Sequence, residues 1–274
     1  MANIPSWVYK LLIVLATIIW GFSFVVMKDV VAVLPPAWLL GMRFLFAGAL
    51  LLVILRKRVM RFCSRKVVTY GFILGVLDFT AFWLQTVGLK HTTPGINAFL
   101  TATYCVLVPF AWWLIARKRP TAFNIVAAIV AVCGIWLVSV SSSGETLSIG
   151  FGEAMTLGCA VAFAAHIVAV SKFAQKCDAL VLTVFQFIAE GALGIIFGAA
   201  TETFPGIAEF TPEIIGQMLF LAVFASVVAF GIQNVSLAHV PPTQASLLLS
   251  LESVFGVVFS ILLYGEQMTL RLVV

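Results

Sequence analysis

The stretch "QTVGLKHTTPGINAFL", residues 85–100, returns later in the chain as "QNVSLAHVPPTQASLL", residues 233–248. At this offset of 148 residues, 9 of the 37 positions between 85 and 121 are identical and keep the same order. Upstream, at an offset of 143, "RFLFAGAL" from Arg43 matches "QFIAEGAL" from Gln186. Self-similarity at a fixed distance indicates a duplicated structural unit. We therefore expect two repeats, residues 1–140 and 141–274.

The composition indicates what kind of helix each repeat contains. Of the 274 residues, 62% are hydrophobic and 10% are charged, whereas soluble domains have about 45–50% and about 25%. A membrane-spanning helix needs roughly 20 apolar residues. Nine such runs are found, at approximately 8–27, 34–55, 68–88, 94–116, 121–140, 149–171, 179–200, 213–237 and 241–264. The sequence therefore predicts an all-α integral membrane protein.

The number of helices in each repeat determines how the two copies are oriented. Each repeat unit holds five spans, and an odd number turns the second copy over relative to the first. The fifth span begins near Thr121, so its counterpart is expected near Thr269, five residues before the sequence stops at Val274. We therefore predict two inverted-topology repeats of five transmembrane helices, with the tenth helix missing from this sequence.

The basic residues predict the orientation in the membrane. Of the 16 Lys and Arg residues, 12 lie on one side, half of them between residues 56 and 66. Positive charge marks the cytoplasmic side, so we expect a cytoplasmic N-terminus and a location in the cell membrane. The formal net charge of +5 is then a topology signal, which leaves no reason to expect a nucleic-acid partner.

Polar residues inside the spans are the candidate site. They are costly in a bilayer and mark binding sites or ion pathways by default. Asp78 and Gln85 share one helix face, and the two offsets map Tyr104 onto Glu252 and Ser23 onto His166. We expect these faces to converge on a midplane cavity with aromatic walls. The candidate substrate-binding residues are Trp20, Ser23, Asp78, Phe82, Gln85, Asn97, Thr101, Tyr104, His166, Gln233 and Glu252.

Two of these residues, Glu252 and Asp78, are also candidates for proton coupling, because a carboxyl group at bilayer depth can exchange a proton. Each candidate has a structural alternative, in which the side chain only bonds one helix to another. Arg43 and Glu190 are interpreted as structural groups that pair with each other or with backbone.

Other classes of function find little support in the sequence. The segment "GFSF", residues 21–24, is superficially similar to the serine motif of intramembrane proteases, with His166 as a possible base. No P-loop, dinucleotide-binding or zinc-protease motif is present. The five cysteines are scattered without metal-binding spacing. We therefore expect no enzymatic activity, no cofactor and no metal. An intramembrane hydrolase using Ser23 and His166, or a structural or lipid-interacting protein, stays as an alternative.

Several segments resemble the EamA-type branch of the drug/metabolite transporter superfamily. They include "IIWGFSFVVMKDV" from Ile18, "MRFLFAGALLL" from Met42 and "LESVFGVVFSILLYGEQMT" from Leu251. Ser253 and the segment "ARKRPT" from Ala116 depart from the family pattern. The resemblance implies ten helices in two inverted halves around a central cavity. It also implies export of small metabolites such as amino acids. A secondary transporter of a small-molecule substrate, with protons as a possible coupling ion, is the function we predict.

Overall fold

The computed structural model describes residues 5–117, 119–123, 125–126, 129–130, 133 and 149–266. In the first repeat the helices are α1 (Ser6–Val33), α2 (Pro36–Ile54), α3 (Arg56–Phe62), α4 (Arg65–Lys90), α5 (Pro94–Ala102) and α6 (Tyr104–Ala116). In the second they are α8 (Phe151–Ala174), α9 (Ala179–Thr201), η1 (Ile207–Glu209), α10 (Pro212–Phe220), η2 (Leu221–Val228), α11 (Ala229–Leu237), α12 (Pro242–Leu249), α13 (Leu251–Phe259) and η3 (Ser260–Tyr264).

Eight stretches of the described chain are long and apolar enough to cross a membrane, and they confirm eight of the nine expected spans. They are Ser6–Val33, Pro36–Ile54, Arg65–Lys90, Pro94–Ile115, Phe151–Ala174, Ala179–Thr201, Pro212–Leu237 and Pro242–Tyr264. The expected fifth span, 121–140, and the expected boundary between the repeats fall mostly or wholly outside the described residues. The expected start of a tenth helix at Thr269 lies outside them as well.

The helices begin where the sequence supplies the groups that start a helix. Proline occupies the first turn of α2, α5, α10 and α12, where its missing N–H is not needed. Side-chain oxygens of Ser64, Thr93, Asp178 and Thr211 accept a hydrogen bond from a backbone N–H three residues later, which caps α4, α5, α9 and α10.

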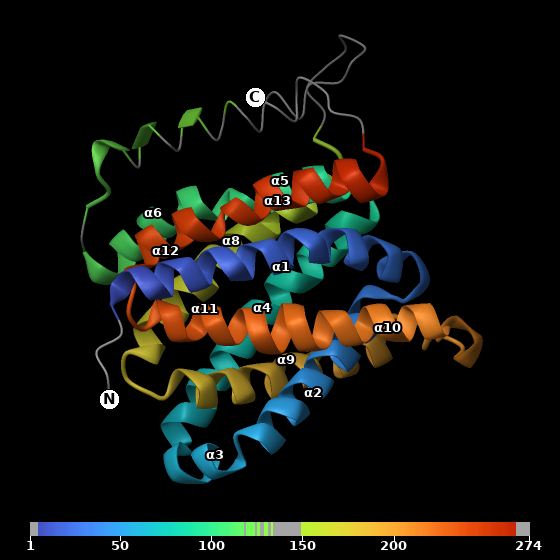
Figure 1. Ribbon diagram of the computed structural model, residues 1–274, viewed down its shortest axis with the longest axis horizontal. Coiled ribbons are helices and arrows are strands. Elements are labelled where there is room, and N and C mark those ends of the chain that lie inside the picture. Colours follow the sequence, from blue (N-terminus) through green and yellow to red (C-terminus); the bar gives the residue numbers. More distant parts are fainter. Residues whose placement is uncertain are drawn as a thin grey trace.

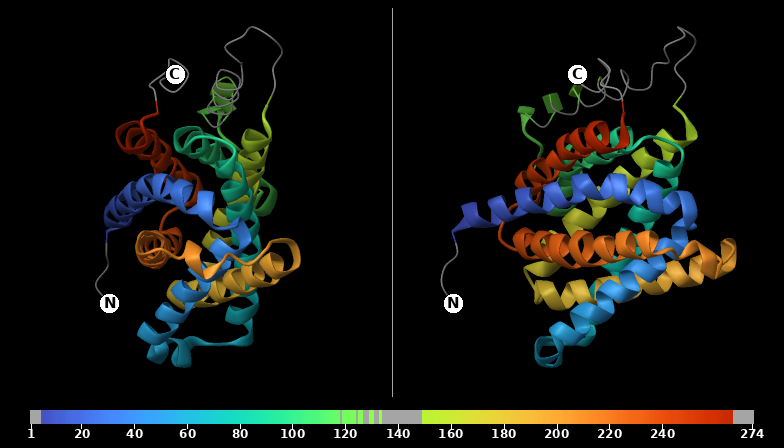
Figure 2. Two further views of the ribbon diagram at one scale, coloured as in Figure 1. Left: turned by 90° about the vertical axis from the view of Figure 1, so that its right-hand side faces the viewer. Right: turned by 45° about the vertical axis from the view of Figure 1, so that its right-hand side comes forward.

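Equivalent helices of the two repeats run in opposite directions. In Figure 1, α1 runs from the N-terminus at the left to the right, whereas its counterpart α8 runs from right to left. The same reversal relates α2 to α9, and α4 to the continuous stretch from α10 to α11 (Figures 1 and 2). This arrangement is the inverted-topology repeat expected from the sequence, and it relates the halves by a pseudo-two-fold axis in the membrane plane.

The strongest packing joins one repeat to the other. Helix α2 packs along α9, α4 packs against α8 and α9, and α1 packs against α13 and α11. Glycines allow the α2–α9 approach, because a methyl group added at Gly194 would lie 2.5 Å from the backbone nitrogen of Gly41. Small residues at such crossings are typical of helices packed in a bilayer. The two halves are thus interleaved, and their interface passes through the centre of the molecule.

Three charged side chains satisfy helix ends at one end of the molecule, opposite the start of α1. Glu202 accepts hydrogen bonds from the backbone of Ala37 at 2.9 and 3.1 Å, at the start of α2. Glu266 accepts one from Gly95 at 3.1 Å, at the start of α5, and contacts Ser260 and Thr93. Lys28 donates to the carbonyl of Leu89 at 2.7 Å, at the end of α4. These bonds complement the partial charges of helix termini.

The glycine contact between α2 and α9 gives the first prediction. Gly194→Ala is expected to lower the free energy of unfolding by about 1–3 kcal/mol, because the helices must move apart to admit the methyl group. Gly216→Ala is the matched control, since a methyl group there meets nothing within 4 Å. Thermal unfolding of the purified variants in detergent measures both. Equal melting temperatures for the two variants would show that the glycine contact is not needed.

Candidate functional site

A cavity lies at the middle of the spans, between the two repeats. Its empty volume is about 550 Å³, part of it open to solvent. Helices α1, α2, α4 and α6 of the first repeat and α8, α11 and α13 of the second line it. Seven of the sequence-predicted residues are among the lining side chains: Trp20, Ser23, Phe82, Gln85, Tyr104, Gln233 and Glu252. The other lining residues are Phe24, Met27, Arg43, Leu89, Phe163, Ile167 and Phe230.

The cavity lining has the pseudo-symmetry of the repeat. The offset of 143 found in the sequence pairs Trp20 with Phe163 and Phe24 with Ile167. The offset of 148 pairs Phe82 with Phe230, Gln85 with Gln233, and Tyr104 with Glu252. Ten of the fourteen lining residues therefore form five equivalent pairs across the axis. The lining of the cavity therefore follows the internal repeat.

Two charged groups face the cavity from different walls. Glu252 comes from α13, which packs against α1 and α5, and Arg43 comes from α2, which packs against α9. The Tyr104 hydroxyl lies beside the Glu252 carboxyl group. Both charged side chains are buried from bulk solvent, with exposed fractions of 6% for Glu252 and 2% for Arg43. The site therefore presents one carboxyl group and one guanidinium group among neutral polar, aromatic and aliphatic side chains.

Arg43 is held by several kinds of contact. Its Nε donates a hydrogen bond of 2.8 Å to the Ser226 hydroxyl. The guanidinium carbon lies 4.6 Å from the centre of the Phe44 ring and 5.0 Å from that of Phe82. Such cation–π contacts stabilise a desolvated cation. The structure thus corrects the purely structural interpretation of Arg43, because this side chain also forms part of the cavity wall.

Interrupted helices place two of the polar cavity residues. The span that contains α5 and α6 is broken at Thr103, and the equivalent span is broken between α12 and α13 at Ser250. The hydroxyl group of each of these residues donates to the carbonyl three residues earlier, at 2.6 and 2.8 Å. Tyr104 follows the first interruption directly, and Glu252 lies two residues after the second. Both interruptions are local, because Thr103 and Ser250 keep right-handed helical backbone angles.

A π-helical segment, η2, forms another part of the wall. The Ser226 hydroxyl donates to the Leu221 carbonyl five residues earlier, at 3.0 Å, and the Trp20 indole donates to the Ala225 carbonyl at 2.8 Å. The second bond fixes Trp20 of the first repeat to the second repeat. π-Helical turns are often found at functional sites, because they free backbone groups for other partners.

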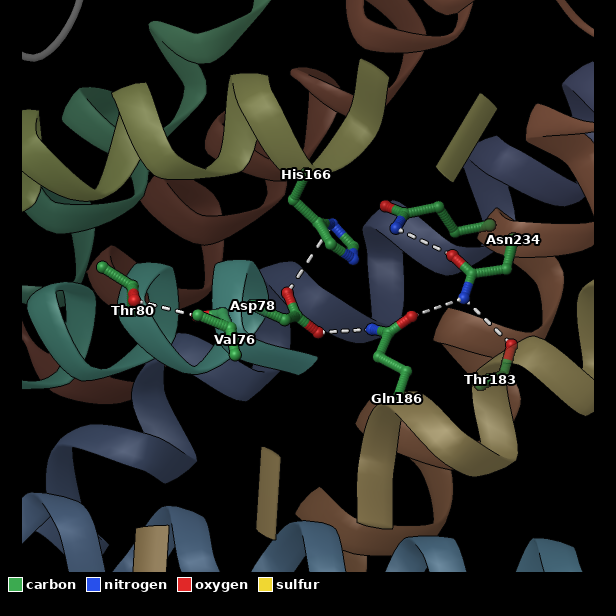
Figure 3. A network of polar contacts seen from close by, with 8 residues as sticks. Val76, Asp78, Thr80, His166, Thr183, Gln186 and Asn234 are labelled. Carbon is green, nitrogen blue, oxygen red and sulfur yellow. Dashed lines mark hydrogen bonds and ion pairs between the residues drawn. The ribbon is translucent and has the colours of Figure 1, made fainter. Parts of the chain in front are cut away.

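Asp78 and His166 were expected to line the cavity, but the structure places them behind its wall. Figure 3 shows Asp78 between His166 and Gln186, with Oδ1 3.7 Å from His166 Nδ1 and Oδ2 2.6 Å from Gln186 Nε2. The chain continues from Gln186 to Asn234 at 3.1 Å. Asp78 and His166 are fully buried. Their polar atoms face one another between α4 and α8, and neither residue is among those that line the cavity.

Asn97 and Thr101 also lie outside the cavity, and they support a residue that lines it. The Asn97 amide donates to Thr156 at 2.7 Å and to the Gln85 carbonyl at 3.2 Å. The Gln85 side chain donates to Thr101 at 3.1 Å. The Thr101 bond holds the Gln85 side-chain amide, and the Asn97 bond holds the Gln85 backbone. Asn97 and Thr101 therefore position a lining group instead of contacting a ligand themselves.

The geometry does not favour the alternative of a hydrolase. The Ser23 hydroxyl donates to the Trp20 carbonyl of its own helix at 2.7 Å. Within the described part of the chain, neither ring nitrogen of His166 has a hydrogen-bond partner. A serine nucleophile needs its base within hydrogen-bond reach. Ser23 and His166 are thus not arranged as a nucleophile and base.

Two inverted repeats of membrane-spanning helices around a midplane cavity form an architecture that many membrane transporters share. The chain matches the EamA-like transporter family over residues 7–140 and 150–274, and it belongs to this family. The two matched stretches correspond to the two repeats seen in the fold.

Individual relatives agree with this assignment. An uncharacterized transporter of Archaeoglobus fulgidus is 29% identical over 255 residues, which are 93% of this chain and 78% of that protein. Protein PagO of Salmonella typhimurium is 29% identical over 81% of this chain and 73% of its own length. A crystal structure of another protein, 16% identical, has a TM-score of 0.73 and covers 96% of this chain and 91% of that chain. The last comparison shows a shared fold.

The lining of the cavity gives the second prediction. In a variant without the five native cysteines, Ser23→Cys is expected to react with a small water-soluble thiol reagent, because Ser23 lines the cavity. Ser171→Cys is the control, since Ser171 is fully buried on α8 and does not line the cavity. Mass spectrometry of the labelled protein measures both. Faster labelling at position 171 than at position 23 would contradict the description of the cavity.

Proposed function

We propose that the protein exports small amphoteric metabolites, such as amino acids or related compounds, across the cell membrane by alternating access. The observation that carries the proposal is the midplane cavity between the two repeats, which presents Glu252 on one wall and Arg43 on another. A carboxylate pairs with the ammonium group of such a molecule, and a guanidinium pairs with its carboxylate. The aromatic side chains around them suit an apolar body.

The interleaved halves support a rocking motion. Each repeat contributes to both sides of the cavity, so a small rotation about the shared axis would close one entrance while it opens the other. Basic residues of α3 and of the loop between α8 and α9 lie at the end where α1 starts, and Glu202 and Glu209 lie at the opposite end. This distribution supports our proposal of a cytoplasmic N-terminus.

Glu252 and Asp78 are the proposed proton-coupling groups. A proton on Glu252 neutralises the charge that would hold an ammonium group, so proton and substrate compete for the same carboxylate. Asp78 would bind a proton behind the cavity wall, without contacting the substrate. Competition of this kind would couple the export of one substrate molecule to the entry of a proton.

The substrate class is tested with matched ligands. L-Phenylalanine and L-leucine carry both charges, their N-acetyl derivatives lack the cation and their methyl esters lack the anion. We expect the free amino acids to raise the melting temperature of the purified protein more than either blocked form does, because only they engage both walls. Thermal-shift measurements in detergent check this. Equal or larger shifts with the blocked forms would contradict the proposal.

The Glu252 contact predicts the effect of a single substitution. Glu252→Gln should weaken binding of the stabilising amino acid by about 1.5–3 kcal/mol, since a hydrogen bond to a charged group is lost. Acid should weaken binding by the wild-type protein and should have no such effect on the residual binding by this variant. Glu213→Gln is the control, because Glu213 is an exposed carboxylate at the start of α10. Calorimetry at several pH values measures these changes. Unchanged affinity and pH dependence in Glu252→Gln would reject its role.

A further inference from the structure

Four ionisable side chains from four helices meet at the cavity wall and behind it, and we call them the buried ionic cluster. They are Arg43 of α2, Asp78 of α4, His166 of α8 and Glu190 of α9. Three of them are completely buried, and Arg43 is 2% exposed. The first two belong to the first repeat and the last two to the second. The cluster therefore lies at the interface that an alternating-access motion would deform.

The members of the cluster act on one another. Arg43 interacts electrostatically with both Glu190 and Asp78, and Asp78 interacts with His166. The distance from His166 Nδ1 to Asp78 Oδ1 is 3.7 Å. The groups that face the cluster from the other helices are uncharged, and they include Ser226 and Phe230. No charge from α11 or η2 compensates the cluster in the described structure.

Several polar atoms of the cluster lack partners. Within the described part of the chain, both Glu190 oxygens, Asp78 Oδ1 and both ring nitrogens of His166 find no hydrogen-bond partner while both carboxyl groups are ionised. The Asp78 and Glu190 carboxyl groups lie close enough to hydrogen-bond once one of them carries a proton. A buried polar atom without a partner costs about 1–3 kcal/mol, and more if it is charged. Protonating one of these atoms would turn it into a donor, or remove its charge. The arrangement thus lacks a donor hydrogen, which a proton would supply.

The charge balance leads to the same conclusion. Arg43 keeps its charge in proteins, and the two carboxylates carry two negative charges, so with a neutral His166 the cluster has a net charge of −1. An uncompensated charge at this depth is strongly unfavourable. One proton makes the cluster neutral, and a second would make it positive. We propose that the buried ionic cluster is a binding site for a single proton, separate from the substrate cavity.

The proton site is connected to the cavity by two routes. The first route is Arg43, which belongs to the buried ionic cluster and also lines the cavity. Gln186 donates to Asp78, Asn234 donates to Gln186, and the lining residue Gln233 donates to Asn234 at 3.4 Å (Figure 3). A proton in the cluster changes the charge directly behind the cavity wall by one unit. The use of this change in transport rests on the proposed function, whereas the proton site itself does not.

The experiment reads the protonation state of all three acceptors without any substrate. The full chain is purified in lipid nanodiscs at mildly alkaline pH, in a Glu252→Gln background that removes the cavity carboxyl group. Infrared spectroscopy detects a protonated Asp78 or Glu190, and nitrogen NMR of labelled histidine detects a charged His166. One protonated acceptor is expected. Glu190→Gln should lose that signal, because Arg43 and Asp78 then balance each other.

Two further variants keep the test decisive. Asp78→Asn should lose the signal for the same reason. This variant provides the test if Glu190→Gln does not fold. The double variant Arg43→Gln with Glu190→Gln should recover one bound proton, because Asp78 is again uncompensated. A purely structural ion-pair network would give no such recovery. Persistence of the signal in Glu190→Gln or Asp78→Asn, or its absence from the unsubstituted cluster, would overturn the proposal.

A transport measurement separates this inference from the proposed function. In proteoliposomes preloaded with L-phenylalanine, Glu190→Gln should still exchange labelled L-phenylalanine but should lose the acceleration by a pH gradient that the wild type shows. If the wild type exchanges no amino acid, the proposed substrate class fails and the proton count still stands. If Glu190→Gln keeps the full response to the gradient, the cluster has no part in coupling.

Discussion

A guanidinium group cannot lie at the depth of a bilayer without compensation, and Arg43 satisfies this requirement with groups from both repeats. Ser226 accepts its Nε hydrogen, Phe44 and Phe82 lie against its plane, and Glu190 and Asp78 supply negative charge. These partners come from α2, α4, α9 and η2. Compensation of one charge therefore fixes how the interleaved helices meet, and it leaves the remaining face of Arg43 for the cavity. The polar interior is organised around this residue.

The repeat explains why so much of the fold was predictable. The match between residues 85–100 and 233–248 established the duplication, and hydropathy with an odd number of spans established the inversion. The same offsets placed Tyr104 opposite Glu252 and Gln85 opposite Gln233, and these residues line the cavity. Periodicity along a helix and equivalence between two copies were enough for these predictions, since both are properties of the sequence alone.

The incorrect placements have a common physical cause. Helix periodicity shows which residues share a face, but the rotation of a helix against its neighbours is determined by packing. Asp78 shares a face with Gln85, yet it lies closer to α9 and bonds to Gln186 instead of reaching the cavity. Arg43 was interpreted as a structural group that pairs with Glu190 or with backbone, and its position in the cavity wall depends on contacts between helices that the sequence does not give. The sequence did contain a signal, because the offset of 143 makes Arg43 equivalent to the neutral Gln186. An arginine whose equivalent residue is uncharged needs acidic groups from other helices.

The charged caps described at one end of the molecule have an energetic consequence for its two faces. There, Glu202 and Glu266 of the second repeat bind backbone N–H groups of the first, at the starts of α2 and α5. At the other end, the ion pair between Arg58 and Asp178 spans 2.8 Å with an arginine that is 48% exposed, and exposed pairs of this kind contribute little. Separation of the halves at the first face must break carboxylate–amide bonds. Separation at the second must break the exposed ion pair, the hydrogen bond from Ser236 to the Tyr9 carbonyl, and the stacked rings of Tyr9 with His239 and of Tyr70 with Phe173. The two faces are therefore held by different forces, with directed carboxylate–amide bonds at the end where α2 and α5 begin and mainly ring contacts at the end where α1 begins.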